Sequence, residues 1–102
     1  MPQVTRLANM IDYQKGSVVS QEIMKAKTGT VTMFAFDEAQ GLSEHITPFD
    51  ALVFVLDGQA EITISKKSHQ VRQGEMIIMP ANQSHALHAK RKFKMLLVMM
   101  RS

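Results

Sequence analysis

Histidine is the residue type in this chain best suited to metal binding or proton transfer, because imidazole titrates near neutral pH and ligates metals through either nitrogen. The sequence has 102 residues, with four histidines, nine methionines and no cysteine. The lack of cysteine excludes disulfides, thiolate nucleophiles and iron–sulfur clusters held by this chain. His45 and His85 each lie near a proline and an apolar stretch, whereas His69 follows two lysines and is predicted to be exposed.

Short apolar segments separated by turn residues predict an all-β protein, organised as a sandwich or barrel. Strands are expected over residues 18–24, 30–36, 51–56, 60–65, 70–72, 76–79, 85–89 and 93–100. The Asp57-Gly58 dipeptide is a strong hairpin signal, because glycine adopts positive φ readily. Residues 37–48 are polar and are predicted to form a loop, and only residues 5–14 have the apolar spacing of a helix.

Composition and charge narrow the class of protein. Hydrophobic residues make up 45% and charged residues 21%, as in a folded domain of this size. The longest apolar runs, 51–56 and 95–100, are far shorter than the ~20 residues of a membrane-spanning helix, and no secretory signal is evident, so we expect a cytoplasmic protein. The net charge of +3 is scattered, apart from a basic cluster at residues 90–94 in an expected turn, and predicts no nucleic-acid binding.

Two glycine-bounded segments contain the histidines of interest. Residues 41–58 read GLSEHITPFDALVFVLDG and residues 74–89 read GEMIIMPANQSHALHA. Together they resemble the two sequence motifs of the cupin superfamily. The resemblance implies a double-stranded β-helix, or jelly-roll, barrel. It also implies a single domain over residues 1–102, with residues 1–17 as an arm or short helix at a dimer contact.

Cupins that bind a metal typically use three histidines and one glutamate, and this chain matches two of those four positions. The resemblance places His45 at the first ligand position and His85 at the last. Thr47 stands at the second histidine position and Ala51 at the glutamate position. The resemblance thus implies one divalent transition metal (Fe, Mn, Ni, Cu or Zn) held by a reduced ligand set, with a metal-free barrel as the alternative.

Asp50 is the best candidate for a third ligand, because it lies one position before the expected glutamate. With both histidines it would form the two-histidine, one-carboxylate set of many non-haem iron enzymes. Strand alternation opposes this reading, since residue 50 faces outward if residue 51 faces inward, unless a bulge at Pro48 shifts the parity. Without a metal, His45 and His85 would serve as general acid and base, with Asp50 orienting an imidazole or accepting a proton.

The nine methionines offer a further set of ligands. Thioethers favour Cu(I), but methionine also fills irregular barrel interiors well. The candidates include Met24, Met33, Met76, Met79, Met95, Met99 and Met100. Both interpretations remain open from the sequence.

Small barrels can hold one small ligand, so the resemblance implies a small-molecule-binding protein. Two functions follow: an enzyme acting on a small organic molecule, or a non-catalytic ligand-binding or interaction module. The segment KMLLVMM at residues 94–100 is apolar on both faces, and one barrel covers only one of them. We therefore expect a homodimer, with this segment and residues 18–24 near its interface.

Overall fold

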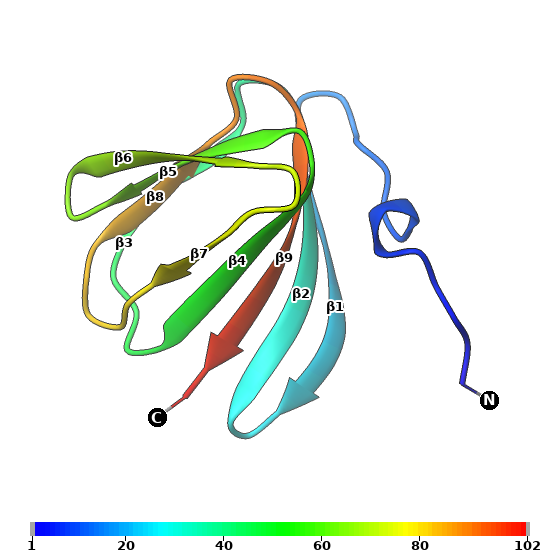
Figure 1. The fold of residues 1–102 in the computed structure, drawn as a ribbon, viewed down its shortest axis with the longest axis horizontal. Helices are drawn as coiled ribbons and strands as arrows, with labels where there is room; N and C mark the ends of the chain where they lie inside the picture. The colour runs from blue at the N-terminus through cyan, green and yellow to red at the C-terminus, as the bar shows by residue number, and fades with distance from the viewer. Residues whose placement is uncertain (1, 102) are drawn as a thin grey trace.

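Nine strands and one short 3-10 helix form the part of the chain that the computed structural model describes, residues 2–101. The helix is η1 (Leu7–Asn9), and the strands are β1 (Val18–Ala26), β2 (Gly29–Phe36), β3 (Gly41–His45), β4 (Asp50–Asp57), β5 (Gln59–Ile64), β6 (Lys67–Arg72), β7 (Met76–Met79), β8 (His85–His88) and β9 (Phe93–Met100). The strands form a five-stranded sheet ordered β1-β2-β9-β4-β7 and a four-stranded sheet ordered β3-β8-β5-β6 (Figure 1). The prediction of an all-β fold is confirmed. No helix in residues 2–101 is both long enough and apolar enough to span a membrane.

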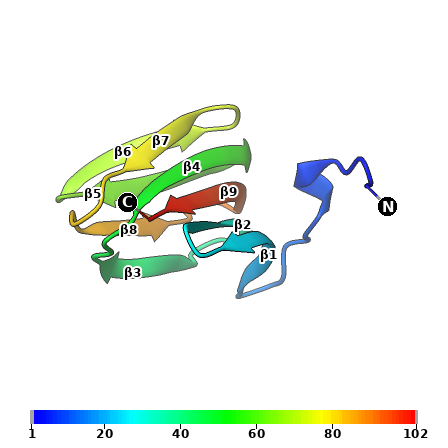
Figure 2. The same ribbon diagram turned by 90° about the horizontal axis from the view of Figure 1, so that it is seen from below.

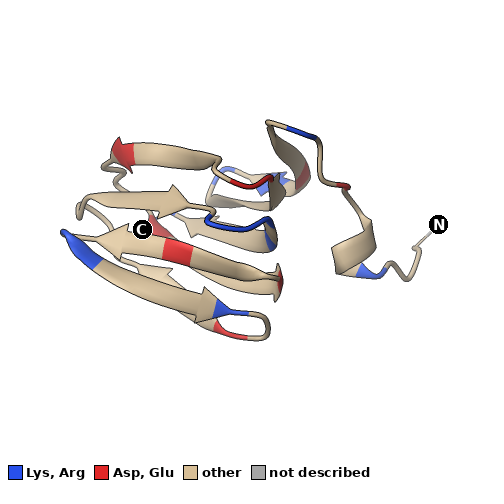
Figure 3. Cartoon of the chain, turned by 90° about the horizontal axis from the view of Figure 1, so that it is seen from above, with Lys and Arg blue, Asp and Glu red and all other residues tan. Residues whose placement is uncertain are grey.

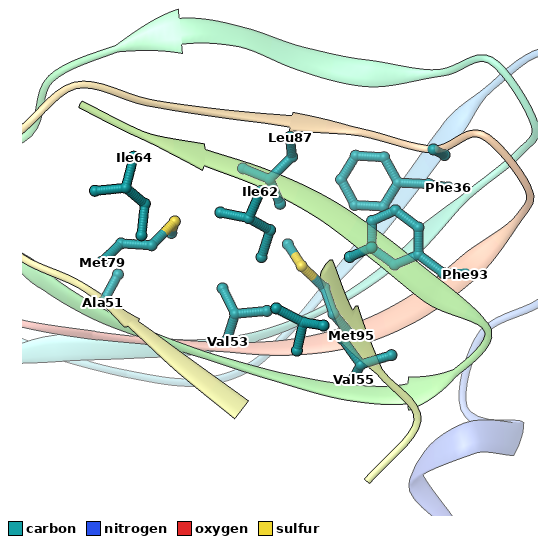
Figure 4. Close-up of a cluster of buried hydrophobic side chains, with 13 residues drawn as sticks. Phe36, Ala51, Val53, Val55, Ile62, Ile64, Met79, Leu87, Phe93 and Met95 are labelled. Carbon is teal, nitrogen blue, oxygen red and sulfur yellow. The ribbon is translucent and has the colours of Figure 1, made fainter. Parts of the chain in front are cut away.

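The hydrophobic core lies between the two sheets, which face each other (Figure 2). β4 shows the alternation that builds it: Ala51, Val53 and Val55 are buried, and the residues between them are partly exposed. Phe36 and Phe93 stack in this core, with ring centroids 4.5 Å apart and planes inclined by 7° (Figure 4). Because inward side chains from both sheets fill the interior, little empty space is left inside the barrel.

The predicted loop over residues 37–48 was wrong in part, because it contains β3. This strand carries almost no apolar alternation and most of its side chains are exposed, so the hydrophobic pattern gave no signal for it. Its backbone is ordered by pairing with β8, where Gly41 lies opposite His88 and His45 opposite His85. Tertiary pairing therefore creates a strand that local sequence did not predict.

The helix expected over residues 5–14 is reduced to η1, which has no side-chain N-cap. The apolar side chains of this segment pack against the sheet without forming a longer helix. Ile11 is buried against Met33 and Ala35 on the outer face of the five-stranded sheet. The N-terminal segment therefore lies on the side of this sheet that faces away from the four-stranded sheet (Figure 1).

Polar contacts hold the N-terminal segment in place. The Tyr13 hydroxyl donates a hydrogen bond of 2.5 Å to Oδ2 of Asp57. The buried Lys94 ammonium donates to the carbonyl of Ala8 at 2.5 Å and lies 5.0 Å from the Tyr13 ring centroid. The second apolar face of β9, which sequence reasoning assigned to a partner subunit, is thus covered in part by the chain's own N-terminus.

A row of apolar residues on the same outer face extends beyond this cover. In register across all five strands, the row consists of Met24, Val31, Val98, Leu52 and Ile78. None of these side chains is fully buried, and those at the two ends of the row are 67% and 48% exposed. A continuous apolar row of this kind is a candidate contact surface.

Two turns have backbone conformations that their residues favour. Gly58 has a φ of +76°, which confirms the hairpin predicted between β4 and β5, and a Cβ there would collide with the Lys92 carbonyl oxygen. Asn82 has a φ of +66°, a left-handed conformation that asparagine tolerates better than most residues. Its amide donates to the Thr47 carbonyl at 2.8 Å, which joins the β7–β8 loop to the β3–β4 loop.

Charged residues of both signs are interspersed along the strands and loops (Figure 3). The basic cluster begins in the predicted turn between β8 and β9. There, Lys90 lies 3.4 Å from the carboxylate of Glu61. At least one lysine of the cluster is therefore paired with an acidic side chain.

Candidate functional site

His45 and His85 lie directly opposite each other at one end of the barrel. His45 is the last residue of β3 and His85 is the first residue of β8, and the two positions pair in the antiparallel ladder. This end also carries the β3–β4 and β7–β8 loops and the C-terminal end of β9, at the bottom of Figure 1. His69 is exposed, as predicted, and His88 is also exposed. The fold thus brings together the two histidines that sequence reasoning selected.

The two imidazoles contact each other through their Nε2 atoms, which are 3.0 Å apart. Their rings meet edge to face, inclined by 75°. Nδ1 of His45 lies 2.8 Å from the Ser43 carbonyl oxygen. Because a carbonyl can only accept, the proton of neutral His45 resides on Nδ1, and its Nε2 carries a lone pair. His85 therefore donates its Nε2–H to His45.

His85 differs from His45 in its surroundings. It is 4% exposed, whereas His45 is open to solvent. Burial lowers the pKa of His85 below its ordinary value of 6.5, and the charge of His45 lowers it further, while the Gln83 backbone acts in the opposite direction. Nδ1 of His85 is buried without a hydrogen-bond partner of normal geometry. The surroundings of His85 thus favour its neutral form and leave one ring nitrogen unsatisfied.

A cavity of about 40 Å³ lies beneath the histidine pair. The side chains around it are mostly apolar, and they include three methionines: Leu42, His45, Thr47, Ala51, Met79, His85, Leu87, Met95, Leu97 and Met99. A water molecule needs about 10–15 Å³ by this kind of measure, so the cavity has room for water or a single ion. An organic molecule would have to bind at the mouth, above the exposed ring of His45.

Asp50 does not line this cavity. Its side chain is exposed, and Oδ1 accepts a hydrogen bond of 2.9 Å from the Ala81 amide. Ala51 faces the interior instead, so Pro48 does not invert the alternation. The two-histidine, one-carboxylate set that we considered from the sequence is therefore not assembled. Within residues 2–101, no group of three or more His, Asp or Glu side chains is arranged to hold a metal ion.

Two of the methionines considered from the sequence as thioether ligands, Met79 and Met99, lie at this end. Ala51 on β4 pairs with Met79 on β7 and with Met99 on β9. Because directly paired residues share a face of the sheet, both thioethers flank the short alanine side chain on the inner side. The sequence predicted strands over residues 76–79 and 93–100, but not that these two methionines lie on either side of residue 51.

A wider depression, about 930 Å³, is at the opposite end, and no histidine lines it. Acidic and basic side chains mix around it, including Asp37, Glu38, Asp57, Arg72, Arg91 and Lys92. It is open and shallow, whereas the small cavity has a buried imidazole at its rim. Chemistry-bearing groups converge at the small cavity, which we therefore take as the candidate site.

A family model described as the Cupin domain matches residues 32–100, a range that includes both histidines. This chain belongs to the cupin family. The resemblance predicted from the two motif segments is thereby confirmed, as is the jelly-roll fold. Cupins include metal-dependent enzymes and non-catalytic members, so family membership does not select between the functions considered above.

Proteins similar to this chain come from several bacteria. A conserved protein of unknown function from Streptococcus pyogenes is 33% identical, with a TM-score of 0.95, and the match covers 100% of this chain and 90% of that one. A cupin superfamily protein from Desulfitobacterium hafniense is 26% identical, with a TM-score of 0.92 and coverage of 100% and 95%. An uncharacterized protein from Streptomyces coelicolor is 27% identical over 67 residues, which span 66% of this chain and 64% of that protein.

Proposed function

We propose that this cupin binds a small molecule at the mouth of the barrel, with His45 and His85 as the groups that contact it. The supporting observation is the pairing of one exposed and one buried imidazole, with their Nε2 atoms 3.0 Å apart at the rim of a cavity. Binding sites are usually concave and mostly apolar, with a few polar groups that set the orientation of the ligand. This end of the barrel has that composition.

The hydrogen bonding of the pair suggests the chemistry of the ligand. A group inserted between the rings would meet the lone pair of His45 Nε2 and the N–H of His85 Nε2. A hydroxyl group satisfies both, because it donates one hydrogen bond and accepts another. In an enzyme, His45 would act as the general base toward that hydroxyl, and His85 would donate a hydrogen bond to the developing oxyanion.

A divalent metal held by His45 and His85 is the metal-dependent form of this proposal. A site of that kind needs at least three protein ligands. Thr47 and Ala51 occupy the other two positions of the cupin set, and the Thr47 hydroxyl donates to the Phe49 carbonyl at 3.3 Å. The residues present do not fit the three-histidine, one-glutamate site, so no step of the chemistry above depends on such a metal.

The second candidate function is a non-catalytic, metal-free module that binds a ligand or another protein. The replacements at Thr47 and Ala51 favour it, because they remove groups with which metal-dependent cupins act. Both candidates use the histidine pair. They differ in whether the bound molecule is chemically changed.

A ligand screen by NMR tests the proposal. A library of small hydroxy compounds is added to ¹⁵N-labelled, metal-free protein, and we expect shifts centred on His45, Ile46 and His85. His45→Ala should abolish the effect, and His69→Ala, a change in an exposed histidine outside the site, should leave it unchanged. Shifts centred on the opposite end of the barrel would contradict the proposal. Conversion of an excess of ligand over time identifies an enzyme, and an unchanged ligand identifies a binding module.

A further inference from the structure

We infer that the mouth of this barrel is a soft-metal site that binds Cu(I) through His45, His85, Met79 and Met99. The inference rests on the proposed function only in using the same histidine pair, and it requires no organic ligand. It differs from the divalent site of metal-dependent cupins in both the ion and the donor atoms. Three features of the structure support it.

The first feature is the position of the two methionines. Met79 and Met99 flank Ala51 in register, on the strands at either side of it. Figure 4 shows Met79 beside Ala51. Because alanine is short, it leaves the space between the two thioethers open. The two methionines thus lie on either side of the residue that stands at the cupin glutamate position.

The second feature is the convergence of donors from both sheets. His45 and His85 come from the four-stranded sheet, and Met79 and Met99 come from the five-stranded sheet. All four line one cavity of about 40 Å³, a volume that suits a single ion. A small enclosed space between two rigid sheets is a better support for a metal than loops are.

The third feature is the separation of the two imidazole nitrogens, 3.0 Å. Two nitrogens bonded to one tetrahedral ion at about 2.05 Å would lie roughly 3.3 Å apart, close to this separation, with the rings turned so that both lone pairs meet at the ion. Nδ1 of His45 already donates to the Ser43 carbonyl. Metal-bound histidines commonly make this kind of hydrogen bond, which leaves Nε2 free to ligate.

The donor set selects the ion. Two neutral imidazoles and two neutral thioethers are soft ligands, and no carboxylate lines the cavity. Thioether sulfur favours Cu(I), whereas divalent Mn and Fe prefer sites that contain oxygen. A monovalent ion also costs less to bury in an apolar cavity than a divalent one.

Anaerobic titration with Cu(I) against a chromophoric Cu(I) chelator tests the inference. We expect one Cu(I) per chain. The double variant Met79→Leu, Met99→Leu should bind at least about tenfold more weakly, since even changes outside the ligand shell cost metal sites that much. Leucine replaces methionine with little loss of stability, so this variant should remain folded.

Met33→Leu is the matched control, because Met33 is fully buried on the outer face of the sheet, away from the cavity. It should bind Cu(I) as the native protein does. X-ray absorption of the loaded native protein should show both nitrogen and sulfur neighbours, and the double variant should lose the sulfur.

Native protein that fails to compete with the chelator would overturn the inference, and so would equal affinities in the double variant and the control. Failure of the copper site is distinguishable from failure of the proposed function. Ligand shifts in metal-free protein that are abolished by His45→Ala would sustain the proposed function even if Cu(I) does not bind.

Discussion

The carboxylate of Asp50 accepts a hydrogen bond from the backbone amide of Ala81, which lies 31 positions further along the chain. This bond ties the start of β4 to the loop that leads into β8. A second bond, from the Asn82 amide to the Thr47 carbonyl, ties the same two loops. We therefore predict that Asp50 acts on His85 as a positioning residue, through the backbone of this loop and not by contact with the cavity.

Asp50→Ala should disturb the loop and shift the NMR signals of the His85 ring, whereas Asp50→Asn should largely preserve them. The reason is that asparagine keeps an oxygen that can accept from the Ala81 amide. Loss of ligand binding in the alanine variant, with rescue in the asparagine variant, is the expected result. Equal loss in both variants would show that the charge itself is needed, as for a catalytic carboxylate.

The stability of the metal-free protein should fall as the pH is lowered through about 6.5, the ordinary pKa of histidine. The cause is His85, whose pKa burial and the neighbouring His45 hold below that value. At pH values between the pKa of His85 in the folded chain and its pKa in the unfolded chain, the unfolded chain binds a proton that the folded chain does not. The free energy of unfolding therefore rises with pH across this range and becomes constant below the folded-state pKa.

Urea denaturation at several pH values measures this effect, and His85→Gln should reduce the slope. His69→Ala is the control, because His69 is exposed and its removal should leave the slope unchanged. An NMR titration that placed the pKa of His85 at or above 6.5 would refute the prediction.

Tyr13→Phe should destabilise the protein by about 1–3 kcal/mol, the usual cost of losing a hydrogen bond to a charged group. The lost bond is the one from the Tyr13 hydroxyl to Asp57. Burial raises the pKa of Tyr13 above its ordinary value of 10.0, with Asp57 adding to the effect, so the bond should persist at alkaline pH. Faster amide exchange in residues 7–13 should accompany the loss, and Asp12→Ala, at an exposed neighbour, should change neither quantity.

We predict that the protein is a homodimer in solution, with β1 and β9 near the contact. The support is the apolar row across the outer face of the five-stranded sheet, which begins at Met24 on β1 and crosses β9 at Val98. A symmetric dimer places the same patch of both subunits in contact. A charge introduced into this row would therefore face either the same charge or an apolar side chain of the partner subunit, and both arrangements disfavour the dimer.

Light scattering should give twice the chain mass of 11.5 kDa for the native protein. Met24→Glu should yield monomers. Ile46→Glu is the matched control, because Ile46 is 63% exposed and Met24 is 67% exposed. Ile46 lies at the mouth of the barrel and outside the apolar row, so this variant should remain a dimer. A native protein of single-chain mass would rule the dimer out.

The fold was predictable where local patterns and backbone preferences agree. Three signals could be read from residues that are close together in the chain: the alternation in β4, the glycine of the β4–β5 hairpin and the two motif segments. β3 was missed because its residues are polar and exposed, and only the partner strand β8 supplies its order. The short helix was overestimated because Ile11 packs against the sheet and does not continue a helical face.

The sequence by itself determined the family, the positions of the strands other than β3, and the choice of His45 and His85, since these depend on residue type and spacing. Only the tertiary structure decided that Asp50 turns outward to the Ala81 amide and that Met79 and Met99 flank Ala51 across the cavity from the histidines. The physical reason is strand register. A shift of one residue reverses the face on which every side chain of a strand lies, and register is set by pairing between segments far apart in the chain.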